Sequence, residues 1–281
     1  MSIKSFFLLV FVFQIGSLQG QTITGKVVDA STGEPLAYVY IELVGRPLRT
    51  NSDETGNFKL EINGLPDDAT IRFSTIGYPA HTFSIKELAG NDEIKVKLES
   101  VTVPLSEVVI TPKKTRKAGM TKCAAGPTYG FEIGHLGKEY ETGLKIELGE
   151  LPAFVKSLHV RVHKNSVDST LLRLHVRNII NGLPGKELLS QNIIIPISKK
   201  SGWADIDLSK YQLSLQGAII LSLELVDVKG KNKSTGKRKP ANEVIQFNTA
   251  KSPTGAYIKQ GSEKQWIRTS DRTPSFYLTV I

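Results

Sequence analysis

The chain has 281 residues, of which 40% are hydrophobic and 22% charged, and this composition predicts a globular protein of about two domains. It excludes wholesale disorder, collagen and a membrane protein with several spans. Residues 21–111 carry 8 Lys and Arg against 13 Asp and Glu (−5) and residues 112–281 carry 27 against 14 (+13), so two different surfaces and an anionic partner for the second are expected.

Residues 1–20 have the features of an export signal. Lys4 precedes an unbroken apolar run from Phe6 to Phe13, and small residues at 17–20 permit cleavage before Gln21. The run is too short to cross a bilayer, which takes roughly 20 residues. We therefore predict a signal peptide at 1–20, a mature chain with no transmembrane segment, and export to the periplasm or cell surface. The residue directly after the cleavage site, Gln21, is not a cysteine, so no lipoprotein anchor is expected.

Residues 21–111 alternate apolar and polar side chains with a period of two. The alternation is clear in 39–43, 58–62, 71–73 and 94–98. It is typical of half-buried antiparallel strands, because successive side chains point to opposite faces of a sheet. Turn signals separate these runs, and in one of them Asp53 and Gly56 fit the first and last positions of a type I turn. The region therefore predicts a β-sandwich.

Several motifs in this region carry a family resemblance. They are Thr24-Gly25-Lys26-Val27-Val28-Asp29, Thr32-Gly33-Glu34-Pro35-Leu36, Asp53-Glu54-Thr55-Gly56-Asn57-Phe58 and Ile71-Arg72-Phe73-Ser74-Thr75-Ile76-Gly77-Tyr78. In this order they resemble the carboxypeptidase-like regulatory domain. The resemblance implies a transthyretin-like, seven-strand sandwich at 21–111, of the kind common in exported proteins of Bacteroidetes-type bacteria, and it implies no catalytic residues.

The segment Leu105-Ser106-Glu107-Val108-Val109-Ile110-Thr111 resembles the end of the same module in TonB-dependent outer-membrane receptors. From its length, the sequence is nevertheless not expected to be such a receptor. Only 170 residues follow Thr111, whereas the strands of a 22-stranded barrel alone need about 200.

Residues 112–126 read PKKTRKAGMTKCAAG, with five basic residues and no acid. We predict a flexible basic linker, and the alternative is a strip that contacts an anionic envelope polymer. The only cysteine, Cys123, lies here. It is expected to be free or paired between chains.

Residues 127–281 again have strand character. Apolar or alternating runs occur at 144–148, 158–163, 171–177, 193–197, 203–208, 218–226, 244–247 and 276–281. About eight to ten antiparallel strands in this length suit a jelly-roll-like sandwich. The expected fold class is therefore all-β, with two β-sandwich domains at 21–111 and 127–281.

The runs at 158–163 and 171–177 are joined by a polar segment, which favours a hairpin. If the two strands pair, one face carries six cationic or titratable side chains: His159, Arg161, His163, Arg173, His175 and Arg177. Since Arg binds carboxylates, sulfates and phosphates in a forked geometry, this face predicts an anion or acidic-glycan site. The alternative is a solvated face, or one neutralised by acids of neighbouring strands such as Glu132, Glu147 and Glu224.

Residues 229–240 read KGKNKSTGKRKP and predict a long exposed hairpin loop. Its cationic residues are Lys229, Lys231, Lys233, Lys237, Arg238 and Lys239. The loop is interpreted either as a solvated tip or as a contact for an anionic polymer or a partner protein.

Catalytic and metal-binding motifs are absent from the sequence, including His-x-x-Glu, His-Glu-x-x-His and Gly-x-Ser-x-Gly. On a strand, His159 and His163 lie about 13 Å apart, too far to chelate one ion. Asp205 and Asp207, about 7 Å apart on one strand face, suit an acid–base pair or a turn cap. Aromatic candidates for stacking on a sugar, or for the core, are Trp203, Tyr211, Tyr257 and Trp266.

These observations predict an exported, non-enzymatic cell-envelope protein with a binding or scaffolding role and no cofactor. The expected partner is an acidic polysaccharide or an envelope protein, and nucleic acid is not expected. One alternative is a polysaccharide-directed hydrolase or accessory domain with an unrecognised site in the C-terminal domain. The other is a structural adhesin that associates through sheet edges.

Overall fold

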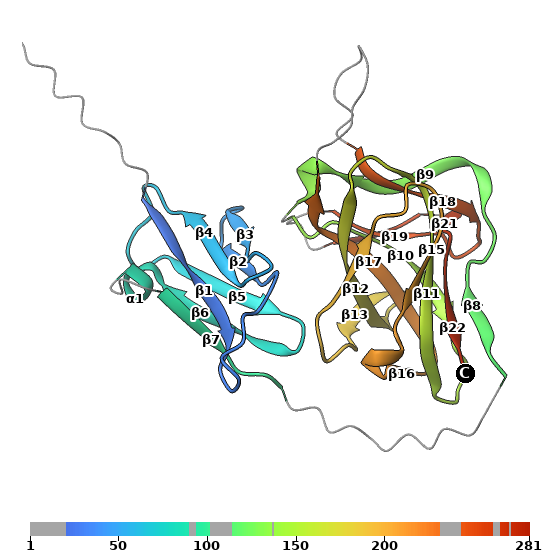
Figure 1. The fold of residues 1–281 in the computed structure, drawn as a ribbon, viewed down its shortest axis with the longest axis horizontal. Coiled ribbons are helices and arrows are strands. Elements are labelled where there is room, and N and C mark those ends of the chain that lie inside the picture. The colour runs from blue at the N-terminus through green and yellow to red at the C-terminus, as the bar shows by residue number, and fades with distance from the viewer. Residues whose placement is uncertain are drawn as a thin grey trace, which may run out of the picture.

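The fold is that of a computed structural model, which describes residues 21–89, 94–101, 114–136, 138–230, 243–260, 265–269 and 271–281. The predicted signal peptide at 1–20 lies outside these residues. So do Lys231, Lys233, Lys237, Arg238 and Lys239 of the basic loop. In Figure 1 the described strands form two separate β-structures, β1–β7 and β8–β22, and the predicted all-β, two-sandwich fold class is confirmed.

The N-terminal sandwich consists of a three-stranded and a four-stranded sheet. The first has the order β4 (Asn57–Glu61), β1 (Thr22–Asp29), β7 (Ile94–Leu98), and the second β3 (Arg49–Asn51), β2 (Tyr40–Leu43), β5 (Thr70–Thr75), β6 (Tyr78–Ser84). A short helix, α1 (Ile85–Ala89), follows β6. The apolar residues of the alternating runs are buried between the sheets, as with Val27 and Val96 against Ile41 and Phe73.

The predicted turn at Asp53 is present. The Gly56 amide donates to the Asp53 carbonyl at 3.1 Å, and the Asp53 carboxylate accepts the amides of Thr55 and Asn57 at 2.8 and 2.9 Å. Gly56 has a φ of +80°, and a Cβ there would lie 2.6 Å from the Val27 carbonyl oxygen. The turn therefore requires glycine at this position for both conformation and space.

The C-terminal sandwich packs two larger sheets around its own core. We call the first the β12 sheet: β13 (Leu183–Glu187), β12 (Ser169–Ile180), β17 (Ala218–Lys229), β10 (Glu141–Glu147), β19 (Tyr257–Lys259) and β20 (Trp266–Arg268), with β14 (Ile193–Ile197) beside β12. The second, the β11 sheet, has the order β21 (Arg272–Pro274), β18 (Glu243–Lys251), β11 (Ala153–Asn165), β22 (Phe276–Val280), β8 (Arg116–Gly119). Strands β15 (Gly202–Asp207) and β16 (Ser214–Leu215) pair with β11, and β9 (Ala124–Glu132) pairs with β18.

The expected hairpin between 158–163 and 171–177 is wrong, because β11 and β12 belong to different sheets. The connecting segment is partly buried, with Lys164 and Asp168 exposed and Asn165 and Val167 buried. Val167 is in the core, and the buried Asn165 side chain donates to the Ile197 carbonyl at 2.8 Å while accepting from the Thr170 hydroxyl at 3.1 Å. A partly buried corner therefore joins the two sheets, where the polar sequence favoured a hairpin loop.

The expected linker at 112–126 is wrong for part of its length. Strand β8 pairs with β22, and β9, which begins at Ala124, pairs with β18. The second sandwich thus begins before residue 127. Strand β8 lies at the edge of its sheet, and Ala118 is its only buried residue. Because one buried residue makes no periodic pattern, the sequence of β8 shows no clear alternation. Cys123 is exposed, and its thiol is free in this structure.

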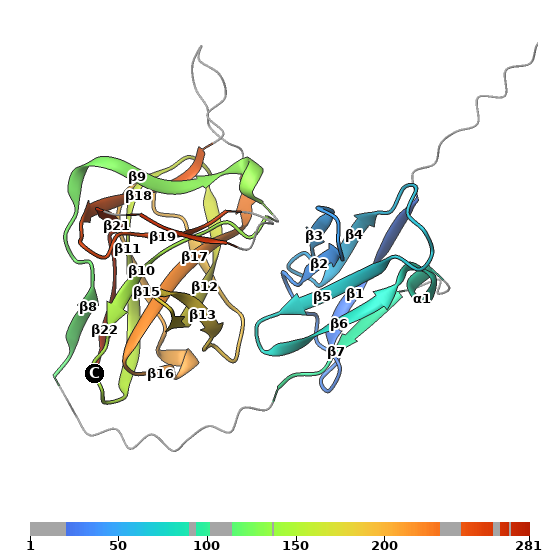
Figure 2. The same ribbon diagram turned by 180° about the vertical axis from the view of Figure 1, so that it is seen from behind.

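The two sandwiches contact each other through the β12 sheet. Tyr38 packs with Leu171 and Val226, and the Asn192 side chain donates to the Ala37 carbonyl at 3.3 Å. In Figures 1 and 2 the N-terminal sandwich accordingly lies on the β12–β13 side, with β8 and β22 on the far side. Among the described residues no helix has the length and apolar character needed to cross a membrane.

Candidate functional site

The six side chains predicted to share one face are divided between two sheets. His159, Arg161 and His163 lie on β11, whereas Arg173, His175 and Arg177 lie on β12. Lys229, the described member of the basic loop set, ends β17, and its exposed amino group pairs with Glu54 of the N-terminal sandwich at 2.6 Å.

The β12 half is part of a buried ion-pair cluster, which we define as Arg173, His175, Arg177, Glu141, Glu187, Glu224 and Lys259. Strand register produces one row of it, because Arg173, Glu224, Glu141 and Lys259 are successive neighbours across β12, β17, β10 and β19. Two cations therefore flank two carboxylates. This arrangement compensates charge within the sheet.

Arg173 is completely buried and connects the two sandwiches. Its guanidinium donates to the Glu224 carboxylate at 3.3 Å, to the Asn192 side chain at 3.0 Å and to the Tyr38 carbonyl. The Tyr40 ring covers it, with the guanidinium carbon 4.3 Å from the ring centroid. Every side of this cation thus has a partner, and none is available to an external polymer.

Arg177 and His175 complete the cluster around Glu141. Both terminal nitrogens of Arg177 donate hydrogen bonds to the Glu141 carboxylate, at 2.5 and 3.0 Å. The Ser222 hydroxyl donates a third hydrogen bond to this carboxylate, at 2.7 Å. Burial acts to raise the pKa of Glu141, but His175, Arg177 and Lys259 outweigh it and lower this pKa to about 2.

His175 lies between carboxylates, 2.7 Å from Glu187 and 3.1 Å from Glu224. Burial acts to lower the pKa of His175, but the carboxylates, Glu141 first, raise it above its usual value.

The anion-site prediction is therefore wrong for Arg173, His175 and Arg177. The alternative of a face neutralised by neighbouring acids describes this sheet, with Glu224 in the expected role and Glu141 and Glu187 in addition. The sequence did not indicate the last two, because only strand order brings them beside β12. Of the aromatic candidates, Tyr257 is buried and Trp266 packs on Arg177, with 5.3 Å from the guanidinium carbon to the ring centroid.

The β11 half remains on the outer face of its sheet and gains partners there. His159 lies directly between Asp205 of β15 and Tyr277 of β22, and Arg161 lies opposite Trp203. Lys117 of β8 lies opposite Thr279. We define the outer face of the β11 sheet by these seven residues: His159, Arg161, Trp203, Asp205, Tyr277, Thr279 and Lys117. His163 is exposed further along the same strand, with its ring 3.4 Å from the Asn248 amide nitrogen.

Stacked rings organise this face. The His159 ring lies flat on Tyr277, 4.2 Å between centroids, and Trp203 meets Tyr277 edge-on at 5.0 Å. Arg161 lies over Trp203 and Lys117 over Tyr277, at 5.8 and 5.1 Å from the ring centroids. These neighbours leave only 8% of Tyr277 exposed, so Trp203, which is partly exposed, is the ring available to a ligand.

A hydrogen-bonded chain crosses the same face. His159 Nδ1 is 2.5 Å from the Asp205 carboxylate, and His159 Nε2 is 2.8 Å from the Thr279 hydroxyl. The carboxylate is 67% exposed. An aromatic ring, an exposed acceptor and a cationic donor on adjacent strands are the groups that hold a hydroxyl-rich ligand. In the described part of the chain, no group of three or more His, Cys, Asp or Glu is placed to hold a metal ion.

The fold and this face define an all-β protein of two sandwiches, the second with an aromatic and polar outer surface. Residues 23–110 match the family model of the CarboxypepD_reg-like domain, so the expected carboxypeptidase-like regulatory domain is confirmed.

No curated protein matches the chain in sequence. One similar solved structure contains the cysteine protease and lectin-like domains of Cwp84, a surface layer associated protein of Clostridium difficile. The two are 13% identical, the match covers 93% of this chain and 59% of the other, and the TM-score is 0.36. At this level the likeness supports no argument about fold or function.

Proposed function

We propose that this chain is an exported, non-enzymatic binding protein of a bacterial cell envelope that recognises a glycan through the outer face of the β11 sheet. The carboxypeptidase-like regulatory domain supports the non-catalytic role. The observation that carries the proposal is the register of β11, β15 and β22, which places Arg161 beside Trp203 and His159 between Asp205 and Tyr277. A sugar stacked on Trp203 would have both donors and acceptors within reach.

The charge of this face favours a neutral glycan. Lys117 and Arg161 are balanced by Asp205 and by Asp207, whose exposed side chain lies on the same side of β15. Of the cations that suggested an acidic polysaccharide, Arg173 and Arg177 are paired with carboxylates within the β12 sheet. An exposed carboxylate next to the stacking ring would repel an acidic sugar, so hydroxyl groups are the expected ligand groups.

Trp203→Ala is expected to weaken glycan binding at least tenfold, which corresponds to about 1.4 kcal/mol. Removal of the ring abolishes the stacking surface and leaves the sheet in place. The measurement is binding to an array of neutral and acidic glycans, followed by titration of each hit. Lys97→Ala, an exposed change on β7 of the other sandwich, is the control and should bind like the unchanged protein.

Two outcomes would overturn this assignment. Either the folded protein binds no glycan on the array, or Trp203→Ala binds as well as the unchanged protein. A blank array points to an envelope protein as the partner. Hits restricted to acidic glycans, with a steep loss of affinity in salt, would instead assign recognition to the basic loop.

One observation favours a hydrolase as a second candidate. Asp205, His159 and Thr279 form a carboxylate–imidazole–hydroxyl chain in the order used for nucleophilic catalysis. The chain crosses the paired strands β15, β11 and β22, whose backbone N–H groups bond neighbouring strands. Such amides are not free to stabilise an oxyanion.

We therefore expect no turnover of p-nitrophenyl acetate beyond that of the His159→Ala and Thr279→Ala variants. The measurement is the steady-state and burst release of p-nitrophenol at pH 7.5. A burst in the unchanged protein that both variants abolish would establish a nucleophile here and contradict the non-enzymatic role.

A further inference from the structure

A cleft of about 420 Å³ opens at a different place in the C-terminal sandwich, where strands of its two sheets meet. It is lined by β9, β10, β18, β19 and the short helix η1 (Ile133–His135). Its volume is within the range of small-molecule sites. None of the lining residues belongs to the outer face of the β11 sheet.

Two carboxylates face each other in this cleft. Glu132 of β9 and Glu243 of β18 are directly opposite in the strand register, and both line the cavity. Like charges in this relation repel each other. Among the described residues, neither carboxylate has a Lys or Arg partner within 4 Å, and no Lys or Arg lines the cleft. The pair is thus suited to a positively charged ligand.

The walls of the cleft are aromatic. The His135 ring stacks on Tyr140 with 3.8 Å between centroids, and Tyr129 and Phe131 also line the cavity. His135 Nδ1 accepts the Glu132 amide at 3.1 Å, which leaves the proton on Nε2. Burial lowers the pKa of His135, so this ring is neutral at neutral pH and adds no positive charge. Neutral rings beside carboxylates attract an organic cation through their faces.

A buried hydroxyl in the cleft has no partner. Thr142 is only 4% exposed, lines the cavity, and its Oγ1 makes no hydrogen bond in this structure. A buried hydroxyl without a partner is costly, so its presence in the wall points to a polar ligand that completes it. This observation is independent of the charge of Glu132 and Glu243.

From these features we infer that the cleft binds a small organic ligand with a protonated amine. The ammonium group lies between Glu132 and Glu243, the ligand carbons contact the rings of His135 and Tyr140, and a polar ligand atom bonds Thr142. A metal ion is a poor fit. Glu141, the third carboxylate that lines the cleft, is already paired with Arg177 and Lys259, so Glu132 and Glu243 alone provide too few ligands, and no three-residue set is present in the described chain.

The test compares glucosamine, which has a protonatable amine, with N-acetylglucosamine, in which a neutral acetamide replaces the amine. The variants Glu132→Gln and Glu243→Gln separate the effect of charge from that of the added acetyl group. Each is titrated into the folded protein, and binding is followed by the NMR signals of the tyrosine and histidine rings. We expect saturable binding of glucosamine and at least tenfold weaker binding of N-acetylglucosamine. Glu132→Gln and Glu243→Gln should each weaken glucosamine binding several-fold, and Thr142→Val should weaken it without a change of charge.

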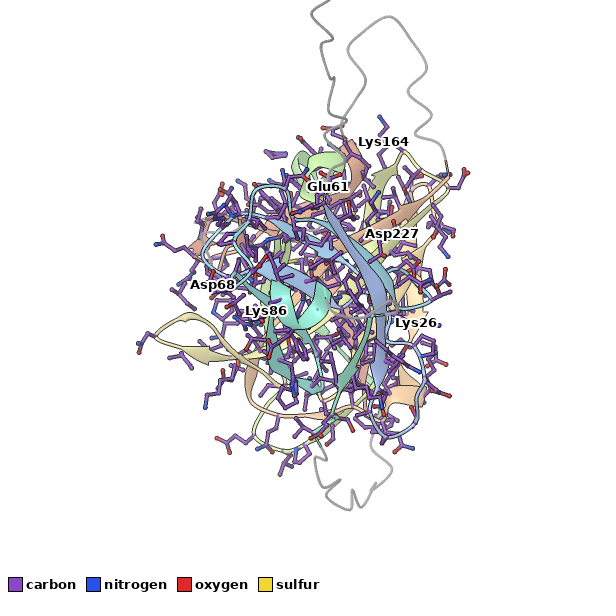
Figure 3. The ribbon with its side chains drawn as sticks, turned by 90° about the vertical axis from the view of Figure 1, so that its left-hand side faces the viewer. Lys26, Glu61, Asp68, Lys86, Lys164 and Asp227 are labelled. Carbon is purple, nitrogen blue, oxygen red and sulfur yellow. The ribbon has the colours of Figure 1, made fainter. Side chains whose placement is uncertain are left out.

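Glu61→Gln is the matched control. Glu61 is an exposed carboxylate on β4 of the other sandwich (Figure 3), and its replacement should leave binding unchanged. Loss of one of the two facing carboxylates should also raise the Tm of the ligand-free protein by about 1–2 °C, which shows that weaker binding is not unfolding. Equal binding of the two sugars, or glucosamine binding that survives in the Glu132→Gln/Glu243→Gln double variant, would overturn the inference.

Discussion

Replacement of Arg173 by leucine is expected to lower the free energy of unfolding by about 3–5 kcal/mol. The change leaves Glu224 as a buried carboxylate that has lost its guanidinium partner, and it removes the donor to the Tyr38 carbonyl. Both groups were desolvated on folding, and water cannot replace the lost donor in a site that is completely buried. The expected loss is therefore a large part of the stability of an ordinary domain.

Urea unfolding followed by circular dichroism measures this loss, and two further variants define its cause. Arg173→Leu/Glu224→Leu should be more stable than Arg173→Leu alone, because it removes the buried carboxylate that lost its guanidinium, while His175 keeps Glu187 as a partner. Lys145→Ala breaks the exposed pair with Glu147 and should cost about 1 kcal/mol or less. If Arg173→Leu costs as little as Lys145→Ala, the cluster does not stabilise the fold as argued.

Alternation of side chains was sufficient to find the strands that form most of the two cores, but not short or edge strands such as β8 and β13. Each predicted run in the C-terminal region coincides with a strand, because every one of them buries its apolar positions in a single core. The N-terminal motifs predicted a sandwich correctly because their apolar residues are also buried in one core. The turn at Asp53 additionally requires glycine at position 56. These are local properties, and each is visible within about ten residues of sequence.

Strand neighbours are not a local property, and the site prediction failed where it depended on them. The period of two shows which residues of β12 share a face, but it does not show that β17 and β10 lie beside them with Glu224 and Glu141. Nor does it show that Tyr40, from the other sandwich, covers Arg173. The outer face of the β11 sheet also depends on strand order. Trp203 of β15 and Tyr277 of β22 lie close together because both strands pair with β11.

The ion-pair cluster should also make stability depend on pH, and Glu141 should dominate the acid side. Its pKa falls from 4.5 to about 2 on folding, because Arg177, His175 and Lys259 hold its charge against the effect of burial. A carboxyl with a lowered pKa stabilises the protein above its unfolded value of 4.5, and this contribution is lost as the pH falls from 4.5 towards 2. The shift corresponds to about 3 kcal/mol.

His175 should act on the other side of the profile. Its pKa is raised above 6.5 by Glu141 and the neighbouring carboxylates, although burial opposes this. A base with a raised pKa stabilises the fold below its unfolded value, and this contribution is lost as the pH rises through the folded value. The cluster is therefore most stabilising between pH 4.5 and 6.5, where Glu141 is ionised and His175 is protonated.

Glu141→Gln should accordingly destabilise the protein most at pH 5–6 and least near pH 2, where the unchanged protein has itself lost the Glu141 charge. The measurement is the free energy of unfolding from pH 2 to pH 9 for both proteins, with Glu147→Gln on the same strand as the control. Glu224 and Asp29, whose pKa values are also lowered, leave an acid limb in the variant, so the argument rests on the difference between the two curves. If the difference in free energy of unfolding between the two proteins stays constant from pH 6 to pH 2, the charge of Glu141 does not contribute to stability and the side chain contributes packing alone.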